Sequence, residues 1–366
     1  MKRIAVNLLS FDTPDLTGVG YFFKRLFEAL PPLVDTEFFF FCQRRFEFER
    51  VIQIPEMIRV TRVNVPNFPN RAARILYEQL VLPFRCRQMN ILYSPCTANP
   101  LFRFNPVVMI TTIHDLTPFY VPNKYGLLQS TYVRYITRLL ARFSDQIITV
   151  SENSKRDLIR ITGVQSSRIQ IIYNFIKTRN VSHIRYDPFF LAVGTRQPAK
   201  NLLGVIRSFS KFCERYDTEN HRLIIVGGSG WGNDEYTNLV AALGMERRIE
   251  FRGYVSEQVL HELYATCKGH ILLSLYEGFG IPVLEALSYH KPSVASNISS
   301  LPEVMGLTGI GVDPHNYEDA AWAIKTIADD PRKHLTGLND QLKKFSAEKQ
   351  VAAFLTVLGV NEAITR

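Results

Sequence analysis

Short apolar runs alternate along the chain with longer segments whose apolar residues recur every three to four positions. The short runs predict β-strands and the longer segments predict amphipathic helices. In the first half we expect strands at residues 4–9, 37–42, 57–63, 91–94, 107–113, 146–150 and 169–173, and helices at 20–30, 71–84, 125–143 and 151–161. Such alternation is typical of parallel sheets whose strands are joined by crossover helices.

A second alternating series follows the segment 177–188, which has little periodicity and is interpreted as a linker. Its strands are expected at 189–193, 221–226, 249–252, 269–273 and 293–295, and its helices at 201–215, 234–243, 259–266, 282–288 and 317–329. We therefore predict an α/β chain of two doubly wound domains, 1–180 and 187–346, that face an interdomain cleft. The helix at 347–358 could pack on either domain. Ligands of such folds bind at the carboxyl ends of the strands.

The composition is that of a soluble globular protein, with 366 residues, 46% hydrophobic and 21% charged. No apolar run reaches the roughly 20 residues that a membrane-spanning helix needs, and no signal peptide is evident. The five cysteines are scattered without a CxxC pair, which indicates neither a disulfide framework nor a zinc site. We expect a cytoplasmic protein, and nothing in the composition indicates a metal or a cofactor.

The positive charge is concentrated in the first half of the chain. Residues 1–180 contain 24 Lys and Arg against 13 Asp and Glu, whereas the remainder is slightly acidic. Such asymmetry predicts an anionic partner for the first half: nucleic acid, a phosphorylated substrate or the inner leaflet of a membrane. The alternative is that these basic residues only keep the domain in solution.

The segment SLYEGFGIPVLEAL, residues 274–287, places Glu277 and Glu285 around a glycine turn between a strand and a helix. Gly278 and Gly280 allow the backbone to approach a ligand, and the amides at a helix start favour an anion such as phosphate. Glu285 could bind a ribose diol, or it could simply complement the helix dipole. Glu277 could bind the hydroxyl groups of a sugar.

Two other strand exits of the second half carry chemistry. Arg196 and Lys200 follow the first strand, where two cations could neutralise a diphosphate leaving group or remain ordinary solvated charges. The glycine-rich exit VGGSGWGNDE at 226–235 matches neither the dinucleotide fingerprint nor the P-loop. A nicotinamide or ATP site is therefore not favoured.

The first half offers three further candidates. Gly18 and Gly20 precede a long amphipathic helix, where they form either a tight turn or a place for a phosphate to approach. His114 and Asp115 follow an apolar strand, which places them at the ligand-binding edge of the sheet. Ser151 starts a helix and could be its N-cap, with Ser154 facing solvent.

Taken together and in this order, these segments resemble the retaining glycosyltransferases of family 4, which have the GT-B architecture. The most specific match is the block EGFGxPxxEA, in which Glu277 and Glu285 correspond to the family's E-x7-E motif. Supporting matches are TGVGY, the pair His114-Asp115, VSENSK, the pair Lys200-Asn201 and GGSGW. The resemblance covers nearly the whole chain.

The resemblance implies a role for each matching residue. The second domain would bind a nucleotide-sugar, with Glu285 at the ribose and with the sugar and diphosphate held by the loop residues Gly278, Phe279, Gly280 and Ile281. Glu277 would lie at the sugar, and Lys200 with Arg196 would stabilise the departing diphosphate. His114 would lie near the anomeric carbon, with Gly18 and Gly20 close to the phosphates. The family keeps the anomeric configuration and needs no obligatory metal ion.

The chain departs from the family pattern at several positions. Arginines common before the lysine are replaced by Thr195 and Ala199, so that Arg196 is the one remaining candidate cation. Asn174 is followed by Phe175 where the family usually has glycine. Ala347 replaces a tryptophan that is frequent near the C-terminus, which leaves the docking of the final helix open.

The details resemble a subgroup of mannosyltransferases, some of them rhamnosyltransferases, of bacterial O-antigen and surface polysaccharide assembly. The resemblance implies GDP-mannose as donor, a polyprenyl-diphosphate-linked glycan as acceptor, and a place at the inner face of the cell membrane. In the helix 125–143, Arg134, Arg138 and Arg142 form a cationic stripe. That stripe could bind the acceptor or an anionic membrane surface, or it could be the solvated face of an ordinary amphipathic helix.

Other functions remain as alternatives. The donor could be dTDP-rhamnose or a UDP-hexose, and the acceptor could be a small soluble molecule, as in sucrose- or trehalose-type synthases. A nucleic-acid-binding protein would explain the charge, but the sequence shows neither aromatic platforms nor a recognised nucleic-acid domain. A catalytically inactive relative is disfavoured because Glu277, Glu285, Lys200 and His114 are all present.

Overall fold

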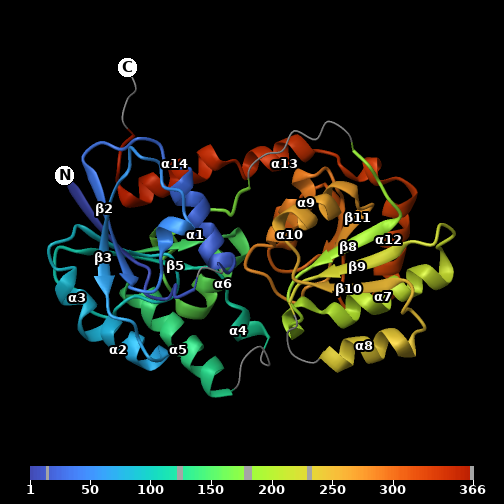
Figure 1. Ribbon diagram of the computed structural model, residues 1–366, viewed down its shortest axis with the longest axis horizontal. Coiled ribbons are helices and arrows are strands. Elements are labelled where there is room, and N and C mark those ends of the chain that lie inside the picture. Colours follow the sequence, from blue (N-terminus) through green and yellow to red (C-terminus); the bar gives the residue numbers. More distant parts are fainter. Residues whose placement is uncertain (14–15, 122–126, 177–183, 229–232, 363–366) are drawn as a thin grey trace. The chain divides into compact units, whose positions relative to one another are not determined.

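The computed structural model describes residues 1–13, 16–121, 127–176, 184–228 and 233–362 (Figure 1). It divides into two compact units: unit 1 comprises Met1–Leu116, Leu128–Phe175 and Ser346–Arg366, and unit 2 comprises Thr117–Leu127 and Ile176–Phe345. Most of the predicted linker, the start of the helix expected at 125–143 and the middle of the glycine-rich exit at 226–235 lie outside the described residues.

Unit 1 is built on one parallel sheet in the order β3-β2-β1-β4-β5-β6-β7. Its strands are β1 Lys2–Asn7, β2 Thr36–Gln43, β3 Arg59–Val65, β4 Ile91–Ser94, β5 Val108–Ile113, β6 Gln146–Thr149 and β7 Ile169–Ile171. Its helices are α1 Gly18–Glu28, α2 Arg71–Leu80, α3 Leu82–Arg85, α5 Leu127–Phe143, α6 Glu152–Thr162 and α14 Ala347–Leu358, with short 3₁₀ turns at Phe48–Arg50 and Ser166–Arg168. The strand order reverses between β1 and β4, and this switch point is where doubly wound sheets bind ligands.

Unit 2 has a second parallel sheet with the order β10-β9-β8-β11-β12-β13. Its strands are β8 Phe189–Val193, β9 Arg222–Val226, β10 Ile249–Gly253, β11 Gly269–Leu272, β12 Ser293–Ser296 and β13 Gly309–Val312. Its helices are α4 Thr117–Tyr120, α7 Leu202–Arg215, α8 Asn233–Ala242, α9 Glu257–Thr266, α10 Ile281–Ser288, α11 Leu301–Met305, α12 Tyr317–Asp329 and α13 Leu338–Lys344, with 3₁₀ turns at Pro198–Lys200 and Pro331–His334. Its switch point lies between β8 and β11.

Both sheets are buried on their two faces, which explains the continuous apolar strands. In β2, Phe39 and Phe41 belong to a core cluster that includes residues of α3, while Phe38 and Phe40 lie against Phe27 of α1 at ring distances of 5.1 and 5.2 Å. Strand β8 divides its side chains between two core clusters in the same alternating way. Alternation along a pleated strand with apolar residues on both faces is expected of a parallel sheet covered by helices.

The last helix, α14, belongs to unit 1 although it is farthest along the chain. Phe354 packs against Phe27 at 5.9 Å and against Tyr93 at 5.2 Å between ring centroids. Gln350 Oε1 accepts a hydrogen bond of 2.9 Å from the backbone N–H of Tyr173. The chain therefore crosses from unit 2 back to unit 1 at its end.

The prediction of an α/β chain with two doubly wound parallel sheets is confirmed. One predicted helix differs: residues 71–84 form α2 and α3, which are separated at Val81. Pro83 explains the break, because it lacks the N–H that a continuous helix would require there. No helix among the described residues is both long and apolar enough to cross a membrane.

Candidate active site

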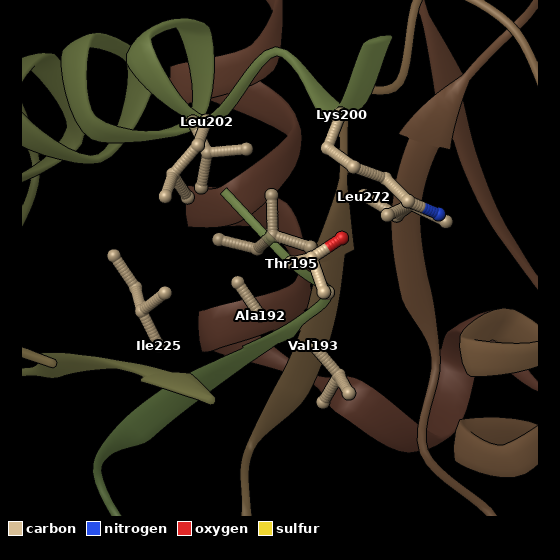
Figure 2. A pocket seen from close by; sticks show the side chains of 10 residues that line it. Ala192, Val193, Thr195, Lys200, Leu202, Ile225 and Leu272 are labelled. Atoms are coloured by element: carbon tan, nitrogen blue, oxygen red, sulfur yellow. The ribbon is translucent and has the colours of Figure 1, made fainter. Parts of the chain in front are cut away.

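A pocket lies at the switch point of unit 2, where the chain leaves β8. It is lined by ten residues, among them Thr195 and Lys200 from the loop after β8 and Leu272 from the end of β11 (Figure 2). The loops that follow β8 and β11 run to opposite faces of the sheet, which leaves a crevice between them. The structure therefore places Lys200 at the expected ligand-binding edge.

Lys200 is paired with Glu277 at this edge. Its Nζ lies 2.5 Å from Glu277 Oε1, and the two side chains are 24% and 13% exposed. The 3₁₀ turn Pro198–Lys200 sets the direction of the lysine, and Asn201 then caps α7 by accepting a hydrogen bond from Gly204 N–H. Two of the residues singled out in the sequence, 77 positions apart, are thus brought into direct contact.

The loop that carries Glu277 is held by serines that the sequence analysis did not identify. Ser274 Oγ donates to Glu277 Oε1 at 2.7 Å, and Ser299 Oγ accepts from the Glu277 backbone N–H at 3.1 Å. Ser300 Oγ donates to the carbonyls of Glu277 and Phe279 at 3.0 and 2.8 Å. The run SNISS after β12 was the available signal, because several hydroxyl groups at a strand exit indicate a polar site.

Glu285 lies on the first turns of α10, and its partner comes from α9. Tyr264 Oη donates to Glu285 Oε2 at 3.0 Å. Burial, reinforced by the neighbouring Glu285 carboxylate, raises the pKa of Tyr264 well above its usual value, so this hydroxyl stays protonated and donates. Tyr264 thereby orients one oxygen of the carboxylate; as an apolar-face residue of a predicted helix, it gave no signal of this role.

The glycine turn between the two glutamates has a backbone that only glycine adopts easily. Gly280 has φ +105°, and a Cβ at this position would lie 2.5 Å from Leu301 Cδ2. The residue is the N-cap of α10, followed by Pro282 in the first turn. The side chain of Phe279 is buried against Phe345 at 5.3 Å, so the ring contributes to packing and only its backbone lines the turn.

Arg196 takes a different direction from Lys200. Its guanidinium lies over the ring of Phe251 in β10, 4.5 Å from the centroid, and the residue is 9% exposed. The structure thus brings Lys200 to Glu277 but places the charge of Arg196 over an aromatic ring. Such a cation–π contact is a stable position for a buried arginine.

A buried histidine, His270 in β11, completes the surroundings of Lys200. Burial, together with the positive charge of Lys200, lowers the pKa of His270 to about 3. Its imidazole is therefore neutral, and its Nδ1 lies 3.3 Å from Ser293 Oγ. The neutral His270 therefore adds no second positive charge beside Lys200.

Unit 1 has its own cavity, of about 250 Å³, at the switch point between β1 and β4. Its lining comes from the loop after β1, the start of α1 and one residue after β4: Ser10, Phe11, Asp12, Thr13, Thr17, Val19 and Cys96. Gly18 and Gly20 begin α1 beside it. A Cβ on Gly20 would lie 2.8 Å from Leu16 Cδ2, so packing of the loop is a sufficient reason for this glycine.

A half-buried polar cluster lies beside this cavity. Ser10 Oγ receives hydrogen bonds from an Arg74 guanidinium N–H and from the Cys96 thiol, the latter at 3.4 Å. Arg74 Nη1 also lies 3.9 Å from Glu78 Oε1, and Glu78 is almost completely buried. Burial raises the pKa of Glu78 to about 7 against the pull of Arg74. The sequence reasoning missed Glu78, although it is the only acid between Glu56 and Asp115.

His114 lies at the end of β5, as its position after an apolar strand predicts. Its Nε2 donates to the carbonyl of Pro95 at 2.7 Å, and its ring makes an edge contact with Phe22 at 5.0 Å. Burial lowers the pKa of His114, so the imidazole is neutral at pH 7. With Nε2 as the donor, Nδ1 is left as a hydrogen-bond acceptor.

The remaining candidates lie on α5 and α6 of unit 1. On α5, Arg138 and Arg142 are exposed and Arg134 is half-buried, so the predicted stripe faces outward from a helix whose other side is buried. Ser151 is the N-cap of α6 and accepts from Ser154 N–H at 3.0 Å, as predicted. The expectation that Ser154 faces solvent is wrong, because this residue is buried. In the part of the chain that the structure describes, no group of three or more His, Cys, Asp or Glu could hold a metal ion.

Two doubly wound parallel sheets in one chain, with charged residues at the strand exits of the second, match the architecture of the GT-B class of glycosyltransferases. Two family models match the chain: "Glycosyltransferase Family 4" over residues 16–180 and "Glycosyl transferases group 1" over residues 175–348. The chain belongs to this family of glycosyltransferases. The resemblance noted from the motifs is thereby confirmed.

Among curated relatives, O-antigen chain mannosyltransferase B of Escherichia coli is 30% identical over 264 residues, which cover 65% of this chain and 67% of the relative. The O-antigen chain mannosyltransferase RfbU of Salmonella typhimurium is 29% identical over 236 residues, which cover 63% and 64%. The aligned part is thus about two thirds of either relative.

Solved structures share the fold over the whole chain. The lipopolysaccharide outer core galactosyltransferase WaaB aligns with a TM-score of 0.69 at 17% identity, covering 98% of this chain and 99% of its own. Sucrose-phosphate synthase of Thermosynechococcus elongatus aligns with a TM-score of 0.76 at 17% identity, covering 98% of both chains. At such identities the likeness concerns the fold.

Proposed function

We propose that the protein is a retaining mannosyltransferase that transfers mannose from GDP-mannose to a polyprenyl-diphosphate-linked oligosaccharide in O-antigen assembly. The observation that carries this proposal is the Lys200–Glu277 pair at the switch point of unit 2, in a chain related to O-antigen mannosyltransferases. The pair combines a cation for a diphosphate with a carboxylate for sugar hydroxyls, which are the two recognition tasks that a nucleotide-sugar presents.

The donor would bind along the loop after β11. The diphosphate takes the amides of Gly278–Ile281 and the start of α10, where the helix dipole favours negative charge. Glu285, oriented by Tyr264, accepts the two hydroxyl groups of the ribose. Glu277, fixed by Ser274 and by the backbone contacts of its loop, accepts hydroxyl groups of the sugar.

In the proposed reaction, the acceptor hydroxyl oxygen forms a bond to the anomeric carbon on the same face from which the diphosphate leaves. The bond between that carbon and the diphosphate oxygen breaks, and the acceptor proton passes to a diphosphate oxygen. Negative charge therefore grows on the diphosphate, and Lys200 stabilises it electrostatically. Arg196 would have to leave the ring of Phe251 to assist, so we assign it a supporting role. No metal ion or cofactor is required in this scheme.

Unit 1 would bind the acceptor. His114, neutral and with Nδ1 as an acceptor, is assigned to the sugar near the anomeric carbon, and Gly18 and Gly20 to the neighbourhood of the phosphates. The net positive charge of residues 1–180 suits the diphosphate of the acceptor and an anionic inner membrane leaflet. We assign Arg134, Arg138 and Arg142 of α5 to that surface, which gives the protein a peripheral location at the inner face of the cell membrane.

The donor is tested by thermal shift with GDP-mannose, UDP-glucose, dTDP-rhamnose and ADP-glucose. GDP-mannose is expected to raise the melting temperature most. A larger shift with dTDP-rhamnose or UDP-glucose would replace the donor in the proposal, and no shift with any of the four would contradict a transferase.

Glu285→Ala is expected to weaken donor binding, whereas Glu277→Ala lowers turnover at saturating donor. A Tyr264→Phe variant should reproduce part of the Glu285→Ala loss, since it removes the hydroxyl that orients this carboxylate.

A further inference from the structure

Five large apolar side chains of unit 1 are exposed together on one side of the molecule. Leu76 and Leu80 of α2 are 60% and 55% exposed, Phe84 of α3 is 52%, and Phe102 and Phe104 of the following loop are 43% and 37%. Phe84 lies 5.0 Å from Phe104 and 6.3 Å from Phe102 between ring centroids. These five residues are called the phenylalanine patch below.

The fold brings the patch together from two segments. Leu76, Leu80 and Phe84 are spaced by four residues along two nearly continuous helices, so they share one face. Gln79 of α2 fixes the loop next to that face, because its Oε1 accepts from Leu101 N–H at 2.9 Å and its Nε2 donates to Asn99 O at 3.1 Å. The patch is therefore a fixed surface rather than a set of scattered side chains.

Isolated exposed apolar residues are common, but a contiguous group of three phenylalanines and two leucines is not. Other exposed aromatic residues are found on the neighbouring helix α5, where Tyr132 and Tyr135 are 37% and 62% exposed. Arg71 of α2 lies over the ring of Tyr132 at 5.6 Å, which places α5 next to α2. Figure 1 shows α3, α2 and α5 along the same margin of unit 1.

The charge around the patch is mostly positive. Between Glu78, which is buried, and Asp145 the sequence has a single acid, Asp115, but six arginines. Arg85 and Arg87, which follow Phe84 in the chain, are exposed, and Arg85 Nη1 donates to Tyr77 Oη at 3.0 Å. Asp145 itself is paired with Arg103 at 2.5 Å. An apolar group with exposed arginines in the same segment of the chain matches a surface with an apolar interior and an anionic boundary.

We propose that the phenylalanine patch inserts into the interface of an anionic lipid bilayer, with Arg85 and Arg87 at the headgroups. Phenylalanine and leucine gain free energy by leaving water, and arginine keeps its charge at the phosphates while its stem stays in the apolar layer. Binding of a second copy of this chain to the phenylalanine patch is less favourable, because it would bring two arginine-rich surfaces together. The inference rests on the proposed peripheral location and identifies the surface that would produce it.

The test is co-flotation of the whole protein with vesicles of phosphatidylcholine alone or mixed in equal parts with phosphatidylglycerol. The wild type is expected to float with the mixed vesicles and much less with the neutral ones. Phe102→Ser with Phe104→Ser should reduce the bound fraction about tenfold, because two exposed rings no longer enter the interface. Arg85→Gln with Arg87→Gln should abolish the preference for the anionic lipid. The matched control is Trp322→Ser with Leu307→Ser, two residues of unit 2 that are 55% and 76% exposed, and it should bind as the wild type does.

Three results would overturn the inference: no flotation of the wild type, equal flotation of the serine variant, or a change of oligomeric state in that variant by size-exclusion chromatography with light scattering. The donor thermal shift is measured on the same samples. A normal donor shift without vesicle binding would reject the membrane surface and leave the transferase intact. Vesicle binding without any donor shift would reject the transferase and leave the surface.

Discussion

Glu277 Oε1 accepts from both Lys200 Nζ, at 2.5 Å, and Ser274 Oγ, at 2.7 Å. A carboxylate held by two donors on one oxygen is fixed in orientation, and its second oxygen can address a ligand. The sequence predicted both members of the ion pair because each follows a strand exit. It did not predict Ser274 or Tyr264. Ser274 is a buried serine in the loop after β11 without a charge to mark it, and Tyr264 gains its role only from Glu285, 21 positions along the chain.

The ion pair is expected to act as one unit in catalysis. Lys200→Met should lower kcat about 100-fold or more, because the positive charge proposed to stabilise the leaving diphosphate is lost. Glu277→Gln keeps the shape of the side chain and the hydrogen bond from Ser274, so it should lower kcat less than Lys200→Met does. The double variant should lose much less than the product of the two single effects, since either change already breaks the pair. Initial rates at saturating donor measure all three; multiplicative losses would mean that the two residues act independently.

Glu78 should make the stability of unit 1 depend on pH. Its pKa is raised from 4.5 to about 7 by burial, so the folded protein favours the protonated form. The protonated Glu78 contributes fully to the free energy of unfolding below about pH 4.5, and this contribution is lost as the pH rises through 7. Ionisation in the folded state costs about 3 kcal/mol, at roughly 1.4 kcal/mol per pH unit between the two values.

Glu78→Gln cannot ionise, so it should be more stable than the wild type at pH 8 and close to it at pH 5. Urea unfolding at several pH values, followed by circular dichroism, gives the two free-energy curves. The control is Glu56→Gln, which removes an exposed acid of the same unit and should run parallel to the wild type. If the free energy of unfolding of Glu78→Gln also runs parallel to that of the wild type across the pH range, ionised Glu78 does not destabilise the folded protein.

At the scale of the elements, the sequence predicted those with a strong pattern. Strands β4 and β8 and helices α12 and α14 have the predicted bounds, because each is a compact apolar run or a regular amphipathic repeat. Strand β13 was not predicted, since Gly309 and Gly311 interrupt its apolar run. Glycine is required at position 309, because a Cβ there would lie 2.3 Å from Ser293 O of β12. Helices α4 and α11 were missed because they are only one turn long.

Gly280 is the position on which the start of α10 depends. Gly280→Ala should lower the free energy of unfolding by about 2–4 kcal/mol, because it adds a strained φ to an overlap with Leu301 Cδ2. The matched control is Gly163→Ala after α6: its φ is +70°, but nothing lies within 4 Å of the added methyl group. That variant should lose only about 1–2 kcal/mol.

The two glycine variants also separate stability from binding. Gly280→Ala should weaken the donor thermal shift, since it displaces the amides proposed for the diphosphate, whereas Gly163→Ala should leave it unchanged. If the two variants change donor binding equally, the proposal that the diphosphate binds at the start of α10 is wrong.

At the scale of the whole molecule, the chain consists of two doubly wound units, and its last helix returns to the first of them. Periodicity predicted the helix at 347–358 but not the unit that it covers. That choice depends on Phe354 meeting Phe27 and Tyr93, which are more than 250 residues earlier. Contacts across such a separation leave no local pattern, so the sequence alone could not assign them.

Phe354→Ala should therefore destabilise unit 1 and leave unit 2 unaffected. Phe354 is fully buried, and truncating such a ring costs about 3–5 kcal/mol. The chain has two tryptophans, both within the range Ile176–Phe345 of unit 2. Any change of tryptophan fluorescence on unfolding therefore comes from unit 2, whereas far-ultraviolet circular dichroism reports on both units.

In urea unfolding, Phe354→Ala should move the part of the circular dichroism transition that belongs to unit 1 to a lower urea concentration. The midpoint of the fluorescence transition should stay unchanged. The converse variant, Phe209→Ala in the core of unit 2, should lower the fluorescence midpoint. A nucleotide-sugar should raise that midpoint in the wild type and in Phe354→Ala alike, because Lys200, Glu277 and Glu285 all belong to unit 2. If both signals shift together in Phe354→Ala, the two units unfold as one cooperative body, and the returning helix stabilises both of them.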